Sequence, residues 1–124
     1  MTMTLQIKRI YEPYQESDGA RFLVDRLWPR GITKEKAPLT GWLKTLAPST
    51  PLRKQFGHMA KNFPAFKTLY RDELDANPEA QADARRIIQQ SQSQTVTLLY
   101  GAKDPQINHA VVLRDYLEEK ASEE

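Results

Sequence analysis

The chain has 124 residues, 40% of them hydrophobic and 27% charged, with a formal net charge of +2. This length and composition are typical of one globular domain, here residues 1–124, and exclude a disordered or fibrous protein. The absence of cysteine excludes disulfides, thiolate metal sites and cysteine nucleophiles. The first residues lack a secretory-signal pattern and no run approaches the length of a membrane span, so the sequence predicts a cytoplasmic protein.

Strand and helix patterns alternate along the first half of the chain. In order, the sequence predicts a strand at 5–10, a solvated loop at 12–20, a strand at 22–28, a short helical turn at 33–37 and a third strand at 41–46. Pro29 and Gly31 end the second strand, because proline cannot continue a strand ladder and glycine permits a turn.

The second half is mostly helical, and proline and glycine mark its boundaries. Thr50-Pro51 predicts a short helix that is capped by Thr50 and ended by Gly57, and Asn77-Pro78 predicts the start of another helix. The remaining expected elements are a helix at 62–76, a buried strand at 95–100 and a last helix from Pro105 to about Lys120. This alternation predicts an α/β fold with a small, mostly parallel sheet of three to four strands covered by helices.

Asp25 and Arg26 are neighbours within the apolar run 22–28. Neighbours on a strand point to opposite faces, so each needs its own partner, and a buried charge without a partner is costly. One interpretation is structural: Asp25 holds a loop, and Arg26 anchors the acidic helix at 72–83. The other is functional: Arg26 or Arg30, near the carboxyl end of the strand, binds an anionic ligand through its planar guanidinium group.

Lys103, Asp104, Asn108 and His109 lie where the last strand turns into the last helix. The carboxyl end of a parallel strand, beside the positive end of a helix, is where small α/β proteins hold their ligands. Asp104 suits a helix cap before Pro105, which is its structural interpretation. His109 can change protonation near neutral pH or donate to an oxyanion, and a purely structural histidine is the equal alternative.

Together, the polar residues after the second strand and those after the last strand predict one site at the carboxyl ends of the strands. This site is expected to bind a small anion that bears phosphate or carboxylate. Ligand binding is assigned to Arg26, Arg30, Lys103, Asp104 and Asn108. Asp25 and His109 form the acid/base pair if the ligand is turned over. His58 is expected at the surface or at the end of the short helix, with membership of the site as the alternative. No cofactor or metal is expected, because the usual metal-ligand motifs are absent.

Basic residues are concentrated in the first half of the chain. Residues 1–71 carry 13 Lys/Arg against 5 Asp/Glu, and residues 72–124 carry 5 against 11, which gives charges of +8 and −6. This asymmetry indicates either an anion-binding face or two halves that pair across the fold. The alternative function is non-catalytic nucleic-acid binding or a regulatory accessory role, through a patch of Arg9, Arg30, Lys34, Lys36, Arg53, Lys54 and Lys61. A third possibility is an interaction module with an exposed aromatic face around Trp42 and Phe63.

Several ordered motifs carry a resemblance that covers nearly the whole chain: Leu-Val-Asp-Arg-Leu-Trp-Pro-Arg-Gly at 23–31, Trp-Leu-Lys at 42–44, Ala-Pro-Ser at 47–49, Leu-Arg-Lys-Gln-Phe-Gly-His at 52–58, and Leu-Leu-Tyr-Gly-Ala-Lys-Asp with Asn-His-Ala at 98–110. In these motifs the chain resembles the YeaO-like branch of the bacterial domain-of-unknown-function family 488. The resemblance implies a small cytosolic α/β protein. It also implies cysteines in the wider family at the positions of Tyr100 and Asn108, and arginine at that of Ala110. This branch therefore cannot repeat a thiol mechanism, and the shared residues fit anion binding better.

Overall fold

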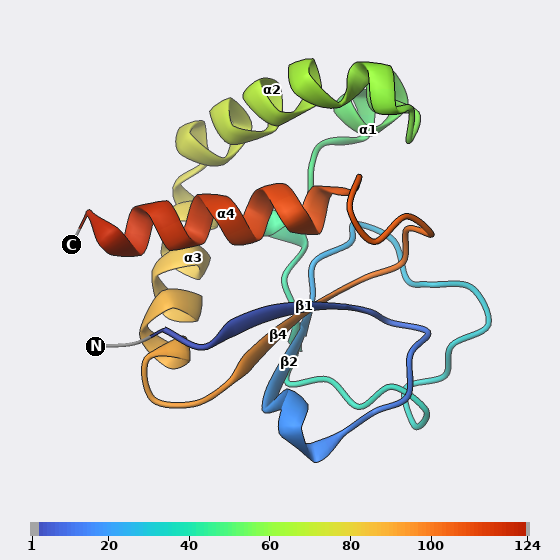
Figure 1. The fold of residues 1–124 in the computed structure, drawn as a ribbon, viewed down its shortest axis with the longest axis vertical. Coiled ribbons are helices and arrows are strands. Elements are labelled where there is room, and N and C mark those ends of the chain that lie inside the picture. Colours follow the sequence, from blue (N-terminus) through green and yellow to red (C-terminus); the bar gives the residue numbers. More distant parts are fainter. Residues whose placement is uncertain (1–2, 124) are drawn as a thin grey trace.

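The computed structural model describes residues 3–123 and places a four-stranded sheet at the centre of the fold (Figure 1). The strands are β1 (Leu5–Arg9), β2 (Ala20–Leu23), β3 (Gly41–Trp42) and β4 (Val96–Tyr100). Their order across the sheet is β1-β4-β2-β3, and every neighbouring pair is parallel. All residues of β4 are buried, as its central place and its largely apolar sequence require. The prediction of an α/β fold with a mostly parallel sheet is confirmed.

Four α-helices gather on one side of the sheet (Figure 1): α1 (Thr50–Phe56), α2 (Phe63–Ala76), α3 (Pro78–Ser91) and α4 (His109–Ser122). Proline in the first turn favours the start of α1, α2 and α3. Helices α3 and α4 pack directly on the sheet, and α2 packs against the other three helices. Within residues 3–123, none of the helices combines the length and the apolar character needed to cross a membrane.

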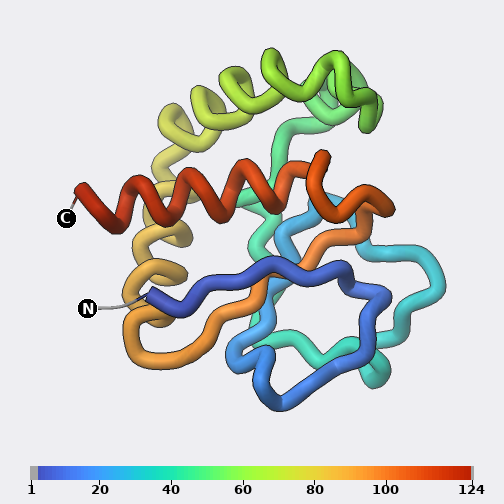
Figure 2. The backbone as a smooth tube through the Cα atoms, viewed as in Figure 1, coloured from blue at the N-terminus to red at the C-terminus, as the bar shows by residue number. Residues whose placement is uncertain are grey.

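Alternate residues of the central strands face the two sides of the sheet. Phe22 and Leu98 are buried in the larger apolar cluster, which lies between the sheet and the helices. Leu23 and Leu99 belong to a smaller cluster on the opposite face. The other members of that cluster include Ile10, Trp28, Ile32, Ala37, Leu39 and Trp42. Figure 2 shows the connection between β2 and β3, in cyan, as a long loop away from the helices, and this loop closes the second face of the sheet.

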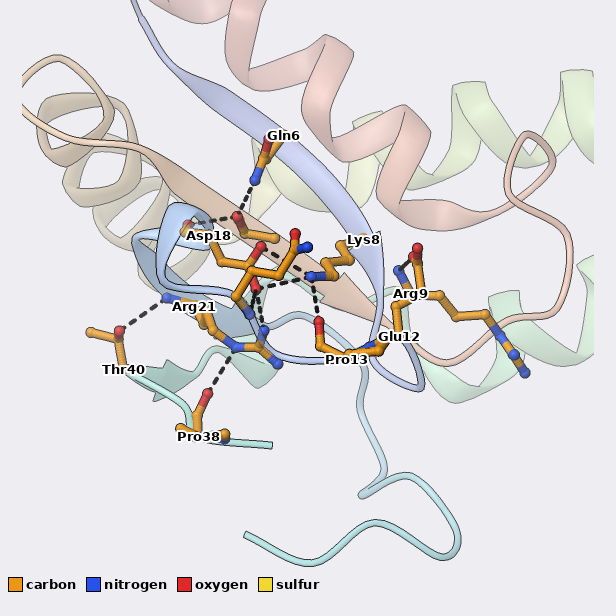
Figure 3. A network of polar contacts seen from close by, with 11 residues as sticks. Gln6, Lys8, Arg9, Glu12, Pro13, Asp18, Arg21, Pro38 and Thr40 are labelled. Carbon is orange, nitrogen blue, oxygen red and sulfur yellow. Dashed lines mark hydrogen bonds and ion pairs between the residues drawn. The ribbon is translucent and has the colours of Figure 1, made fainter. Parts of the chain in front are cut away.

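The second face also carries a buried polar network (Figure 3). Asp18 is only 1% exposed, and its carboxylate pairs with Lys8 Nζ at 3.1 Å and with the Arg21 guanidinium. The backbone oxygen of Asp18 accepts a hydrogen bond from the Thr97 hydroxyl at 2.7 Å. The prediction that 12–20 is a solvated loop is therefore wrong at its end, because Asp18 is buried there. Its carboxylate joins β1 to β2, and its backbone oxygen accepts a hydrogen bond from β4.

β2 ends earlier than the predicted strand at 22–28. The strand stops at Leu23 because the backbone oxygen of Asp25 accepts the Trp42 indole N–H at 2.6 Å instead of a hydrogen bond from a neighbouring strand. Asp25 and Arg26 therefore lie beyond the strand, and the prediction that they sit within it is wrong. This correction moves both side chains to the carboxyl edge of the sheet, where the chain leaves it.

Two further boundaries differ from the prediction. The third strand, expected at 41–46, is reduced to β3, because Lys44–Leu46 forms a single 3₁₀ turn. Helix α1 is capped by Ser49 rather than Thr50, and the Ser49 hydroxyl oxygen accepts the Leu52 N–H at 3.3 Å. Thr50 is then the first helical residue, which leaves its side chain free to line the region described next.

Candidate functional site

A cavity of about 460 Å³ opens at the carboxyl edge of the sheet, where β2 and β4 end. It is lined by Asp25, Arg26, Leu27, Pro48, Thr50, Arg53, Lys54, Phe56, His58, Phe66, Gly101, Ala102 and His109. These residues come from the segments after β2 and β4, from the loop before α1, from α1 and α2, and from the first residue of α4. The two stretches singled out in the sequence therefore meet, since Asp25, Arg26 and His109 line the same cavity.

Asp25 connects the ends of the two central strands. Its Oδ2 accepts the Gly101 N–H at 2.9 Å. A Cβ atom at residue 101 would lie only 3.0 Å from this oxygen, so glycine lets the backbone approach the carboxylate closely. Its Oδ1 is buried, accepts no hydrogen bond of good geometry, and lies 3.0 Å from His109 Nε2. Asp25 thus holds the chain after β4 in place, as its structural interpretation predicts, while it faces the cavity.

The imidazole of His109, the first residue of α4, is fixed by two oxygen atoms. Its Nε2 lies 3.0 Å from the backbone oxygen of Val24 and 3.0 Å from Asp25 Oδ1. Because a carbonyl oxygen can only accept, Nε2 carries the hydrogen and donates it to the Val24 oxygen, and Asp25 Oδ1 lies beside this donor without a hydrogen bond of its own. The ring also packs edge-on against Tyr70, with 6.3 Å between the centroids. A carboxylate beside an imidazole is suited to acid/base chemistry, and the same contact anchors the start of α4 to the end of β2.

Arg26 is held by backbone oxygens rather than by a carboxylate. Its Nε donates to the Pro48 oxygen at 3.1 Å, and its Nη2 donates to the Ala47 oxygen at 3.3 Å. The suggestion that Arg26 anchors the acidic helix at 72–83 is wrong, because its partners lie in the loop before α1. The guanidinium keeps its positive charge and further N–H groups beside the cavity.

Two polar contacts support this wall of the cavity from behind. The Tyr70 hydroxyl donates to the backbone oxygen of Leu46, and burial, followed by the negative charges of Asp25 and Glu73, raises the pKa of Tyr70 well above its ordinary value. The phenol is therefore a neutral donor. Glu73 accepts the Ser49 N–H at 2.9 Å and the Ser49 hydroxyl at 2.5 Å. These contacts fix the start of α1, which carries several of the lining residues.

Three further titratable side chains of the cavity are not among the residues that the sequence assigns to the site. Arg53 and Lys54 are in α1, and His58 follows it. The sequence assigns the two cations to a nucleic-acid patch and favours a surface position for His58. The signal that could have found them is the basic motif 52–58, but only the packing of α1 beside the end of β2 brings that motif to the cavity.

The four other residues assigned to ligand binding do not line the cavity. Arg30 is exposed in the loop after β2, where its backbone oxygen accepts the Tyr11 hydroxyl at 2.9 Å. Lys103 and Asp104 are exposed, and Asn108 is fully buried. Among the residues assigned to the site, the structure therefore brings together Asp25, Arg26 and His109, and it places the rest elsewhere.

The last helix begins at His109 and not at Pro105, because Asn108 and Asp104 cap different structures. The Asn108 Oδ1 accepts the Val111 N–H at 3.0 Å and so caps α4. Asp104 Oδ1 instead accepts the N–H groups of Gln106 and Ile107, which lower the pKa of its carboxyl below the ordinary value. The prediction of Asp104 as the helix cap is therefore wrong, and the turn that it closes leads into the real cap.

We expect Asn108→Ala to lower the free energy of unfolding by about 2 kcal/mol, because it removes a helix cap and a buried amide that donates to the Asp104 oxygen at 2.7 Å. Urea unfolding followed by circular dichroism measures the loss. Asn108→Asp keeps an oxygen that can cap the helix, so it should recover part of the stability. Equal losses for the two variants would contradict the capping role.

The residues of the expected basic patch and of the expected aromatic face come from segments on both sides of the sheet. Lys34 and Lys36 lie in the loop on the second face of the sheet, whereas Lys61 lies beside α2 on the helical side. Trp42 packs in the smaller cluster, edge-on to Trp28, and Phe63 packs against the larger cluster on the other side. Each set is therefore divided between the two faces of the sheet.

Comparison with known proteins places the chain in a family. Residues 4–124 match the family DUF488-N3i, described as the "Inactive DUF488-N3 subclade". The chain is 44% identical over 115 residues to "Uncharacterized protein YeaO" of Escherichia coli (strain K12), covering 93% of this chain and 97% of that protein. It is 34% identical over 113 residues, 91% of this chain and 92% of the relative, to both "Uncharacterized protein Rv3073c" of Mycobacterium tuberculosis (strain ATCC 25618 / H37Rv) and "Uncharacterized protein Mb3100c" of Mycobacterium bovis (strain ATCC BAA-935 / AF2122/97). No solved structure matches. The chain therefore belongs to the DUF488-N3i family and is a homologue of YeaO.

Proposed function

We propose that the cavity binds a small anion bearing phosphate or carboxylate and holds it without turning it over. The observation that carries the proposal is the charge of the cavity lining. Arg26, Arg53 and Lys54 stand against one carboxylate, that of Asp25, which leaves a formal charge of +2 with both imidazoles neutral. Cationic side chains that converge on one concave site are suited to recognising an anion.

The three cations lack internal counter-charges. Among residues 3–123, no carboxylate lies within ion-pair distance of the charged nitrogens of Arg26, Arg53 or Lys54. The one carboxylate of the cavity, Asp25, is already engaged with Gly101 and His109. The amino end of α4 adds a partial positive charge, because the helix dipole is oriented with its positive end at His109. An anionic ligand would supply the missing partner.

Binding without turnover agrees with what is known of the family and of the site. The subclade is described as inactive, and the chain has no cysteine to serve as a nucleophile. The Asp25–His109 contact also has a sufficient structural role, because it joins the end of β2 to the start of α4. The acid/base assignment of these two residues is therefore replaced in the proposal by an anchoring one.

The proposal can be tested by NMR titration of the ¹⁵N-labelled protein with inorganic phosphate and, separately, with acetate. We expect saturable shifts of the amide signals of Leu27, Gly101 and His109. Arg53→Gln combined with Lys54→Gln should weaken binding about ten-fold or more, because charge-assisted hydrogen bonds to the anion are lost. The matched control is Arg85→Gln combined with Arg86→Gln, which removes two exposed cations of α3 outside the cavity and should leave the affinity nearly unchanged.

Two outcomes would contradict the proposal. One is the absence of saturable shifts with either anion. The other is tight binding of single-stranded DNA that falls steeply with salt and is weakened by Lys34→Gln and Lys36→Gln but not by the α1 variants. That result would instead support the nucleic-acid alternative, because phosphate neutralisation releases counterions.

A further inference from the structure

The cavity has a second chemical character besides its charge. Its volume of about 460 Å³ falls in the range of about 300–1,000 Å³ that is usual for sites of organic ligands, and an inorganic anion would fill only a small part of it. Carbon atoms form much of the remaining wall, from Leu27, Pro48, Phe56 and Phe66. The anionic head of a ligand would therefore account for only part of the space.

Aromatic rings form a continuous series that starts with Tyr70, behind the cavity wall, and continues with Phe66, Phe56 and His58, which line the cavity. The rings of Tyr70 and Phe66 have centroids 5.4 Å apart, those of Phe66 and Phe56 are 4.3 Å apart, and those of Phe56 and His58 are 5.5 Å apart. The series starts beside His109, which packs on Tyr70, and it ends at His58. Both imidazoles line the cavity, so the series has a lining ring at each end.

The end of this series has an unusual backbone. His58 has φ of +57°, a left-handed conformation that residues with a side chain rarely adopt, and it follows Gly57, which has the same φ. Strain of this kind collects at functional sites, where the surrounding structure maintains it. Here the turn after α1 keeps an exposed imidazole packed on Phe56 and on the cavity wall.

Leu27 adds an apolar contact at the same cavity. Its exposed fraction of 63% is the largest among the exposed large hydrophobic residues of the described chain. A single exposed leucine is ordinary on a protein surface. This one, however, directly follows Asp25 and Arg26 and lines the proposed anion site, where the ring of a bound ligand would remove it from water.

From these observations we infer that the ligand is an aromatic organic anion. Its ring packs against His58 and Leu27, and its phosphate or carboxylate group is held by Arg26, Arg53 and Lys54. This inference rests on the proposed function. It identifies the uncharged part of the ligand, and the proposed function identifies the charged group that the cations hold. It does not depend on which of the two anionic groups the ligand carries, because the ring contacts are separate from the charged ones.

The inference can be tested by calorimetric titration with pairs of anions that differ by a ring. Phenyl phosphate is compared with methyl phosphate, and phenylacetate with acetate. For at least one anionic group, the aromatic member should bind about ten-fold or more tightly than its partner, since the ring buries apolar surface. His58→Asn removes the imidazole, keeps a residue that tolerates a left-handed backbone, and should reduce this preference to a few-fold at most, as should Leu27→Ser. Met59→Ser is the matched control, because Met59 is 47% exposed beside His58 and does not line the cavity.

The results separate failure of the inference from failure of the proposed function. If both members of each pair bind equally and Arg53→Gln weakens both, the anion site stands and the aromatic assignment is overturned. If none of the four anions binds saturably, the proposed function fails and the inference fails with it. A ring preference that survives in both His58→Asn and Leu27→Ser would also overturn the assignment of the ring contacts.

Discussion

Asp18→Asn is expected to lower the free energy of unfolding by about 3–5 kcal/mol, because it leaves two buried cations without their anion. The side chain of Arg21 is only 3% exposed and that of Lys8 12%, so water cannot replace the lost carboxylate. Chemical unfolding in urea at neutral pH measures the loss. The control is Asp115→Asn, which breaks the exposed contact of Asp115 with Arg114 and should change the free energy by less than about 1 kcal/mol. Similar losses in both variants would contradict the buried-pair argument.

The same pair predicts how stability depends on pH. Burial raises the pKa of Asp18, but hydrogen bonds from the Gln15 N–H, Lys8 and Arg21 outweigh burial and hold the pKa below the ordinary value. A carboxyl whose pKa is lower in the folded state stabilises the fold above its unfolded pKa, and this contribution is lost as the pH falls through the folded pKa. The difference in the free energy of unfolding between wild type and Asp18→Asn should therefore be largest at neutral pH and should decrease below about pH 4. A difference that stays constant down to pH 2 would contradict this account.

Gly19→Ala is expected to be the second most damaging change, with a loss of about 3 kcal/mol or more in the free energy of unfolding. Gly19 has φ of +66°, and a Cβ atom there would lie 2.1 Å from the backbone oxygen of Thr95. That oxygen also accepts the Ala20 N–H at 2.9 Å, so it cannot move away without loss of a hydrogen bond at the start of β2. Thermal and urea unfolding of the variant measure the cost.

Gly31→Ala separates the two sources of this cost. Gly31 also has a positive φ, +74°, but no atom lies within 4 Å of a Cβ placed there. Gly31→Ala should therefore lower the free energy of unfolding by only about 1–2 kcal/mol, which is the cost of placing a residue with a Cβ atom in a left-handed conformation. If Gly31→Ala is as damaging as Gly19→Ala, the steric explanation for Gly19 is wrong.

The elements that the sequence predicts well are those in which local pattern and burial agree. The strand expected at 95–100 is β4, and the helices expected at 62–76 and after Asn77-Pro78 are α2 and α3, each with its boundary within a residue or two. In these segments the apolar residues that form the periodic pattern are those that the fold buries in its core, so the pattern predicts the element correctly.

The wrong predictions arise where the local sequence is compatible with two structures and contacts with distant residues decide between them. Asp104-Pro105 and Asn108 are both good helix starts, and only the packing of α4 on the sheet decides between them. The run at 22–28 has the composition of a strand, but the indole of Trp42, distant in sequence, takes the Asp25 backbone oxygen. Asp18 resembles a loop residue because its buried partners, Lys8 and Arg21, lie on two different strands.

The candidate site could be predicted only in part. That Asp25, Arg26 and His109 come together follows from one rule, since residues after adjacent parallel strands meet at the same edge of the sheet. The contributions of Arg53 and Lys54 could not be predicted, and that of His58 was open between the surface and the site, because all three depend on where α1 lies relative to that edge. No local pattern in α1 determines its placement.

The hydrogen bonds from Arg26 to the carbonyl groups of Ala47 and Pro48 have a consequence for the pH dependence of the proposed anion binding. If an internal carboxylate neutralised the guanidinium, protonation of that carboxylate at low pH would free the guanidinium to bind an anion. The affinity for the anion would then depend on pH. Carbonyl groups do not titrate, and neither does arginine in the range where proteins fold. The positive charge at this position is thus permanent, and the lowest pH at which the proposed anion binds would be set by protonation of that anion.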